Sequence, residues 1–239
     1  MDFKGTSALV TGAGRGLGAA LAEGLAARGA KVVLVARDAS ELDAVASRIR
    51  GRGGEAWALP ADLGAKDAIH PLAAMASALA GPIDVLVHCA STLGPVPMPL
   101  LLDTACEDLE RVLSVNLLGP FRLTRALLGP MHLAGRGLVL SVSSDAAVTA
   151  YPRWGAYGVS KSALDQLSRA FAVEVPGVRF LSVDPGEMNT RMHSEAMPEA
   201  DPASLADPSE VAELVLQYVT GTAFASGSRV EAGQLRGAS

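Results

Sequence analysis

The chain has 239 residues and a net charge of −5; 49% of its residues are apolar and 19% are charged. The negative charge argues against a surface that follows a phosphate backbone, so we do not expect nucleic acid as a partner. The apolar fraction and the alternation of strand-like and helix-like segments from start to finish predict one α/β domain over residues 1–239, with a sheet covered on both faces.

Targeting and metal-binding signals are not found in the sequence. Asp2 and Lys4 flank a stretch too short for the apolar region of a signal peptide, so we expect a cytoplasmic protein. The longest uncharged stretch, 85–102, contains a glycine and three prolines that would break a membrane helix. Two cysteines and four scattered histidines have no disulfide or metal-ligand spacing, and we predict no metal site and no membrane contact.

The first predicted strand, Ser7–Thr11, runs directly into the glycine-rich turn 12–18 and then into an Ala/Leu-rich helix. This order is typical of the opening of a dinucleotide-binding fold, because glycines let the backbone approach a pyrophosphate and the helix N-terminus attracts it. Two registers fit. Gly14-x-Gly16-x-x-Ala19 matches the general fingerprint, whereas Gly12-x-x-x-Gly16-x-Gly18 begins where the strand ends, and we prefer the second.

The remaining elements alternate in the same way. Further strands are predicted at 31–36, 55–59, 83–88, 137–143, 178–183 and 227–230, and helices from Asp38 onward and at about 67–79, 107–132, 155–173 and 209–219. The prediction is a doubly wound (Rossmann) parallel seven-stranded sheet in the order 3-2-1-4-5-6-7, with the site at the carboxyl ends of strands 1, 4, 5 and 6.

The end of the second strand indicates which dinucleotide is bound. NAD-preferring folds usually place a carboxylate there, whereas a 2′-phosphate needs cations. Here Arg37 follows Ala36, and Arg15 in the glycine turn approaches from the other side, so we predict NADP(H) as the preferred cofactor with NAD(H) possible. In the alternative interpretation, Asp38 binds the ribose hydroxyl and Arg37 is a solvated surface residue.

Tyr157 and Lys161 are four residues apart in a predicted helix, so their polar ends reach one spot. A nearby ammonium favours the phenolate and is expected to lower the pKa of the tyrosine, which makes it a proton donor and acceptor. Taken alone, such a pair more often marks a solvated helix face.

Thr11-Gly-x-x-x-Gly-x-Gly18 together with Tyr157-x-x-x-Lys161 resembles the short-chain dehydrogenase/reductase family, in its compact single-domain, NADP-preferring branch. The resemblance covers almost the whole chain. It extends to Asn116 in a helix, to Ser144 thirteen residues before Tyr157, and to Asp184-Pro185-Gly186 followed by Thr190.

The resemblance implies a division of roles. Tyr157 is the acid/base residue, Lys161 holds the nicotinamide ribose, Ser144 hydrogen-bonds the reacting oxygen, and Asn116 supports a water relay to Lys161. Ser143 is the alternative to Ser144. Asp62 resembles the adenine-contacting residue, or else it caps the next helix. The expected cofactor contacts are Thr11, Gly12, Gly14, Arg15, Gly16, Leu17, Gly18, Arg37, Asp62, Leu63, Ala90, Tyr157, Lys161, Pro185, Gly186 and Thr190.

One segment departs from the family pattern. The family commonly has Asn-Asn-Ala-Gly after strand four, whereas this chain has His88-Cys89-Ala90-Ser91, in which only Ala90 matches. The loss of the asparagine side chains puts adenine affinity and local rigidity in doubt.

The expected substrate pocket is formed by 93–98, 145–154 and 187–197, which offer the aromatic residues Tyr151 and Trp154 and the methionines Met188, Met192 and Met197. Such walls suit a small, largely apolar ligand; Arg153 and Arg191 either recognise an anionic group or are surface residues. The proline-bounded stretch 187–207 is expected to be a mobile lid. The predicted function is an NADPH-dependent carbonyl reductase or alcohol dehydrogenase, as a homodimer or homotetramer. The alternative is a non-catalytic NADP(H)-binding regulatory or scaffold protein.

Overall fold

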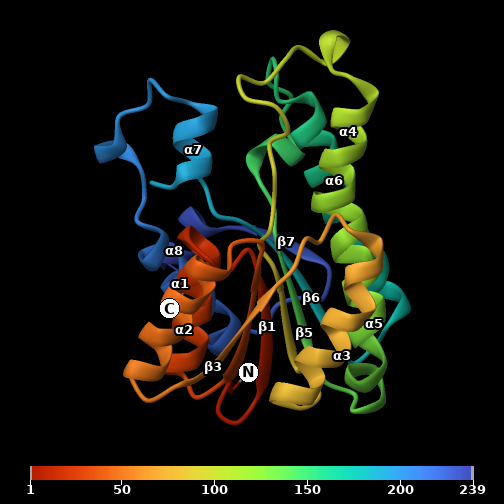
Figure 1. Cartoon of the computed structure of the whole chain (residues 1–239), viewed down its shortest axis with the longest axis vertical. Helices are drawn as coiled ribbons and strands as arrows, with labels where there is room; N and C mark the ends of the chain where they lie inside the picture. The colour runs from red at the N-terminus through yellow and green to blue at the C-terminus, as the bar shows by residue number, and fades with distance from the viewer. Residues whose placement is uncertain (1, 238–239) are drawn as a thin grey trace.

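The structure is a computed structural model that describes residues 2–237, and its centre is a seven-stranded sheet (Figure 1). The strands lie in the order β3-β2-β1-β4-β5-β6-β7, and every neighbouring pair is parallel. Their bounds are β1 Ser7–Thr11, β2 Lys31–Ala36, β3 Glu55–Pro60, β4 Val85–His88, β5 Leu138–Val142, β6 Arg179–Asp184 and β7 Ser228–Glu231. The predicted strand order is confirmed.

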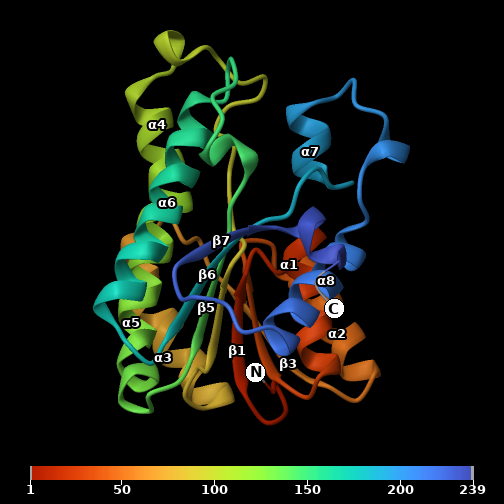
Figure 2. The same ribbon diagram turned by 180° about the vertical axis from the view of Figure 1, so that it is seen from behind.

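Helices cover both faces of the sheet (Figure 2). One face packs against α1 (Gly16–Ala27), α2 (Ala39–Gly51) and α8 (Pro208–Gly221), and the other against α3 (Ile69–Ala80), α5 (Gly119–Leu133) and α6 (Gly155–Glu174). Successive residues of β1 enter opposite layers: Ala8 and Val10 join the first core cluster and Leu9 joins the second. The strands read as continuous apolar runs because both faces are buried.

The predicted long helix at 107–132 is helical throughout, but its middle is not α-helical. It consists of α4 (Cys106–Leu113), a π-helical turn at Ser114–Leu118, and then α5. Pro120 lies in the first turn of α5, where its missing N–H is tolerated. The wider π turn contains Asn116, which is fully buried. Such a widened turn is a common place for a functional residue.

The predicted loop after Gly186 contains the short helix α7 (Arg191–Ala196) and a 3₁₀ turn, Pro202–Ser204. Backbone hydrogen bonds close its base: Asn189 N–H donates to the Ala206 carbonyl at 2.9 Å, and Ala206 N–H donates to the Glu187 carbonyl at 3.1 Å. Residues 190–205 therefore form a protruding segment whose two ends are held together by backbone hydrogen bonds. Within residues 2–237, no helix is long and apolar enough to cross a membrane.

Candidate active site

A cleft of about 1670 Å³ lies at the carboxyl ends of the strands. Segments that follow all seven strands line it, together with residues of α7. In Figure 1, α7 rises above the sheet on one side and α4 with the start of α6 on the other. The predicted position of the site is the position of this cleft.

The glycine turn has the second of the two registers considered. Gly12 and Gly16 have positive φ angles of 67° and 54°, which favour glycine. A Cβ on Gly12 would lie 2.7 Å from the Ala90 nitrogen, and one on Gly18 would clash with the Gly12 carbonyl oxygen. At Gly14 the nearest obstacle is only the Glu41 side chain, so the requirement for glycine is strongest at positions 12, 16 and 18.

The start of α1 is open to the cleft. Its N-cap residue, Arg15, makes no side-chain capping hydrogen bond, and Gly16, Leu17 and Gly18 line the cleft. The first N–H groups of a helix have no partner within the helix and carry its positive dipole end. This turn therefore offers the donors that a pyrophosphate requires.

Thr11 was expected to contact the dinucleotide, but its side chain lies behind the cleft wall. It is fully buried, and its hydroxyl donates to the Val87 carbonyl at 3.1 Å and accepts from Cys89 N–H at 3.1 Å and Ala90 N–H at 3.2 Å. Thr11 thus fixes the segment that follows β4.

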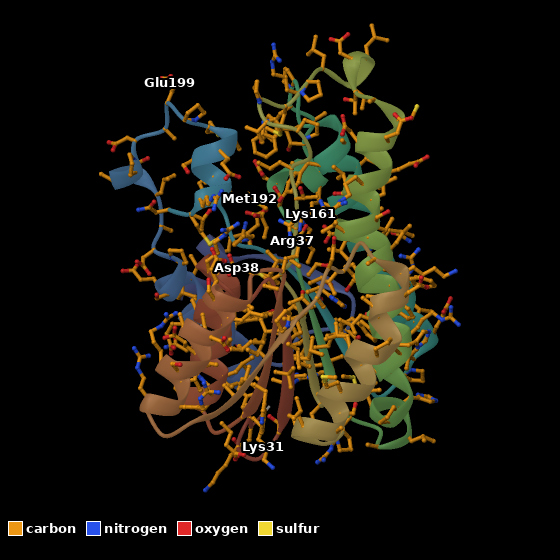
Figure 3. The ribbon with its side chains drawn as sticks, viewed as in Figure 1. Lys31, Arg37, Asp38, Lys161, Met192 and Glu199 are labelled. Carbon is orange, nitrogen blue, oxygen red and sulfur yellow. The ribbon has the colours of Figure 1, made fainter. Side chains whose placement is uncertain are left out.

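Two positive and two negative side chains gather at the end of β2, three of them from the segment after β2 and Arg15 from the glycine turn. Arg15 pairs with Glu41 at 2.9 Å. Asp38 accepts from Ser40 N–H at 2.9 Å and Glu41 N–H at 3.1 Å, which caps α2. Arg37 is exposed on the cleft wall and forms no hydrogen bond or ion pair with the residues that the structure describes. Figure 3 shows Arg37 and Asp38 at the upper end of the sheet.

Asp62 performs the turn role that was the alternative to adenine binding, and it also borders the cleft. Its carboxylate accepts from Gly64 N–H at 2.8 Å and pairs with Arg111 at 3.2 Å. The neighbouring Leu63 is buried at the cleft wall.

The two serines after β5 face different ways. The Ser143 hydroxyl donates to Asp165 Oδ2 at 2.7 Å, so this buried side chain already has a partner, although Ser143 borders the cleft. The Ser144 hydroxyl donates to Asp145 Oδ1 at 2.9 Å and accepts from Ala146 N–H, and Ser144 lines the cleft. Ser144 is the less buried of the two, and the preference for Ser144 as the serine that contacts the substrate stays a prediction.

Tyr157 lies in a dry part of the cleft. It packs with Leu93, Met98 and Ala146, and the Trp154 ring meets it edge-on with the centroids 5.6 Å apart. Burial raises the pKa of Tyr157 above its usual value, and the Asp184 charge adds to that rise. Hydrogen bonding by Ser144 and Ser91 acts in the opposite direction, but the net direction is upward.

Lys161 is buried beside Tyr157. Its ammonium donates to the Val142 carbonyl at 2.7 Å and lies 5.5 Å from the centre of the Tyr157 ring. Burial lowers the pKa of Lys161 to about 8, opposed by the charges of Asp165 and Asp184. The predicted lowering of the Tyr157 pKa is not seen in this structure, because burial of the phenol is the largest effect and the net direction is upward.

Asn116 joins two walls of the site from behind. Its side-chain oxygen accepts from Thr92 N–H at 2.8 Å, and its amide donates to the Thr92 carbonyl and to Ser160 Oγ, each at 2.9 Å. The side chain therefore ties the segment after β4 to α6. Its predicted part in a water relay stays a prediction.

The segment after β6 borders the opposite side of the cleft. Gly186 has a φ of 71°, and its N–H donates to Asp184 Oδ1 at 3.0 Å. The Thr190 hydroxyl accepts from His193 N–H at 3.2 Å and caps α7. Pro185, Gly186 and Thr190 all line the cleft, and their predicted contact with the nicotinamide side of the cofactor stays a prediction.

Arg229 was missed by sequence reasoning because a single arginine in a short strand gives no signal. Its guanidinium lies 2.7 Å from Asp184 Oδ2, 3.3 Å from Asp165 Oδ2 and 3.5 Å from Glu231 Oε1, and it donates to the Ser144 carbonyl at 3.0 Å. This network joins β6, β7 and α6 directly behind the Ser144 segment.

The substrate end of the cleft is largely apolar. Its wall includes Val96, Val148 and Tyr151, as well as Met192 and Met197 from the lid segment. Arg191 pairs with Glu195 at 2.7 Å, and Arg153 donates to the Met98 carbonyl at 3.2 Å. Both arginines already have partners, which disfavours their use on an anionic substrate.

The chain is similar in sequence and in structure to known proteins. The short chain dehydrogenase family profile matches residues 6–201. A short chain dehydrogenase of Pseudocercospora fijiensis is 35% identical over 198 residues, which cover 80% of this chain and 62% of that protein. A short chain dehydrogenase structure from Pseudomonas syringae superposes with a TM-score of 0.89 at 34% identity, over 97% of this chain and 96% of that one. Another, from Shigella flexneri 2a strain 301 and complexed with NADP, gives 0.87 at 28% identity over 97% and 99%.

The Arg229 network predicts a large stability effect. Arg229→Met leaves the buried carboxylates of Asp165 and Asp184 without their cation, so the free energy of unfolding should fall by about 3–5 kcal/mol in urea titration. Arg52→Met is the matched control, because it breaks an exposed pair with Glu23 and should cost less than about 1 kcal/mol. Equal losses in the two variants would contradict a structural role for the network.

Proposed function

We propose a specific reaction for this chain, which belongs to the short-chain dehydrogenase/reductase family and is an NAD(P)-dependent oxidoreductase. The reaction is hydride transfer from NADPH to the carbonyl carbon of a small, largely apolar substrate, and its reverse. The observation that carries the proposal is the convergence of Ser144, Tyr157 and Lys161 on the cleft that begins at the glycine turn.

The residues present fit a dinucleotide. The open N-terminus of α1 and the close approach of Gly12 to Ala90 form a cradle that any larger residue at position 12 would fill. In the proposed arrangement this turn holds the pyrophosphate, Asp62 and Leu63 border the adenine, and Lys161 holds the nicotinamide ribose. When bound, the dinucleotide supplies or accepts the hydride.

The side chains divide the proton chemistry. In the reducing direction Tyr157 donates its phenolic proton to the substrate oxygen, and Ser144 donates a hydrogen bond to the same oxygen. These donors stabilise the negative charge that develops on that oxygen more than they stabilise the neutral carbonyl. The raised pKa of Tyr157 keeps the phenol protonated at neutral pH, which suits the reducing direction.

We propose NADPH as the preferred cofactor because Arg37 has the only guanidinium at the end of β2 that, within the described residues, is without an internal partner. Asp38 is engaged as a helix cap, which leaves it less suited to bind a ribose hydroxyl. The NADP complex of the Shigella flexneri protein supports the same preference. Arg15 contributes less than expected, because Glu41 pairs with it.

Arg37→Ala tests this preference. A charge-assisted hydrogen bond to the 2′-phosphate contributes about 1.5–3 kcal/mol, so NADPH should bind at least about tenfold more weakly while NADH binding stays unchanged. Fluorescence titration with both cofactors measures this, and Arg52→Ala, at the far end of α2, is the control. An unmodified protein that bound the two cofactors equally would contradict the proposal.

We propose that residues 187–207 form a lid on a single domain. The ends of this segment are tied by backbone hydrogen bonds, while Met192, His193 and Met197 border the cleft. Closure would remove water from the hydride-transfer site, as loops over active sites commonly do. The cytoplasmic location and the homodimeric or homotetrameric state stay predictions from the sequence.

Limited proteolysis tests the lid. A glutamate-specific protease should cut first at Glu199, at the outer end of the protruding segment (Figure 3), and saturating NADPH should slow this cut severalfold. Cleavage at Glu107, in the first turn of α4, serves as the internal control that NADPH should not change. A rate at Glu199 that is indifferent to NADPH would argue against closure.

Tyr157→Phe tests the enzymatic function. The ring and its packing stay, so folding and NADPH affinity should hardly change, but turnover with a panel of ketones and aldehydes should fall at least about 100-fold. Lys161→Ala should lower turnover and also weaken NADPH. If the Phe variant turned over normally, or if the unmodified protein bound NADPH but reduced nothing in the panel, the non-catalytic alternative would be favoured.

A further inference from the structure

The proton of the Ser144 hydroxyl already has an acceptor in the structure. Ser144 Oγ lies 2.9 Å from Asp145 Oδ1 and 3.2 Å from the backbone nitrogen of Ala146. A hydroxyl has one proton to donate, an ionised carboxylate only accepts, and a backbone N–H only donates. Ser144 therefore donates to Asp145 and accepts from Ala146, and this arrangement leaves no proton for a substrate oxygen.

Asp145 is held in place for this contact. Its Oδ1 also accepts from Ala146 N–H at 2.8 Å, at the start of the 3₁₀ turn Asp145–Ala147. The backbone of Ser144 is fixed as well, because Arg229 donates to its carbonyl at 3.0 Å. Asp145 and Ser144 both line the cleft. A substrate oxygen that approaches Ser144 therefore competes with this carboxylate for the same proton.

We propose that Asp145 is a positioning residue that withholds the Ser144 proton from a neutral carbonyl and releases it to the transition state. The inference rests on the proposed function. A hydrogen bond to an ionised group is roughly twice as strong as one between neutral groups, so Ser144 keeps its bond to Asp145 while the substrate oxygen is uncharged. As the hydride leaves NADPH for the carbonyl carbon, negative charge grows on that oxygen, and the Ser144 hydroxyl turns to it.

The exchange changes only the acceptor of the Ser144 proton. The substrate oxygen takes its proton from Tyr157, and Ser144 keeps its own. Because the bond from Ser144 to the substrate forms in the transition state and not in the ground state, it raises kcat without tightening substrate binding. Burial is the main cause of the raised pKa of Tyr157 and the Asp145 charge adds to it, so the same carboxylate helps to keep the phenol protonated.

Asp145→Asn tests the proposal. The amide keeps the shape of the side chain but not its charge, so Ser144 becomes able to bond a neutral carbonyl. Cyclohexanone cannot react in the complex with NADP⁺, because both are oxidised, and its dissociation constant there is measured by ligand-observed NMR. It should bind roughly two- to tenfold more tightly to Asp145→Asn than to the unmodified protein, which is the contribution of a neutral hydrogen bond.

Two comparisons separate this role from a direct effect of the charge. With Ser144→Ala as the reference, adding Asp145→Asn should give no gain in cyclohexanone affinity. Asp103→Asn removes an exposed carboxylate outside the cleft lining and should leave the affinity unchanged. A gain of the same size with and without the Ser144 hydroxyl would overturn the proposal, and so would an unchanged affinity in Asp145→Asn.

A second measurement needs neither a ligand nor turnover. The hydrogen bond between Ser144 and Asp145 should couple the two side chains in urea unfolding. The unfolding equilibrium constant of Ser144→Ala/Asp145→Ala should change by roughly two- to tenfold less than the product of the single effects. Strictly additive effects would overturn the proposal. Coupling in a protein that binds NADP⁺ but no cyclohexanone would uphold the contact that holds the Ser144 proton and count only against the proposed substrate class.

Discussion

The active-site geometry depends on one partly buried cation. Arg229 draws Asp165 of α6 and Asp184 of β6 to the same guanidinium, and it also binds the Ser144 carbonyl. Because Asp165 in turn accepts from the Ser143 hydroxyl, Ser143 is turned inward and Ser144 is presented to the cleft. Two buried carboxylates would be expensive to desolvate without this partner. The cation that neutralises Asp165 and Asp184 thus also fixes the orientation of the Ser143–Ser144 segment.

Desolvation is the main influence on the protonation of Tyr157 and Lys161. The dry surroundings that favour hydride transfer raise the pKa of Tyr157 and lower that of Lys161, so burial favours the neutral form of both. The attraction between an ammonium and a phenolate is the usual explanation for such a pair, but here burial is the larger effect. A bound oxidised nicotinamide carries positive charge. Such a charge near the phenol lowers the pKa of Tyr157, whereas burial raises it.

Much of the fold could be predicted from the sequence, because the patterns that indicate it lie within short segments of the chain. Each strand is a short apolar run, and the glycine turn combines positive φ at Gly12 and Gly16 with close packing at Gly18. The cleft residues followed from motif spacing. What could not be read depends on distant partners: Thr11 bonds a segment nearly eighty residues away in sequence, and Arg229 is one charge in a short strand. The π turn was hidden because its residues also fit a continuous helix.

The departure from the family pattern after β4 is explained by these distant contacts. The sequence put local rigidity in doubt at His88-Cys89-Ala90-Ser91, since the usual asparagines are absent. In the structure, His88 Nε2 lies 2.8 Å from Thr124 Oγ1, Thr11 holds the next two N–H groups, and Asn116 holds Thr92. Rigidity therefore comes from other elements. Because hydrogen bonds from Thr11 and Asn116 fix the backbone of this segment, it does not need the asparagine side chains that the family commonly has there.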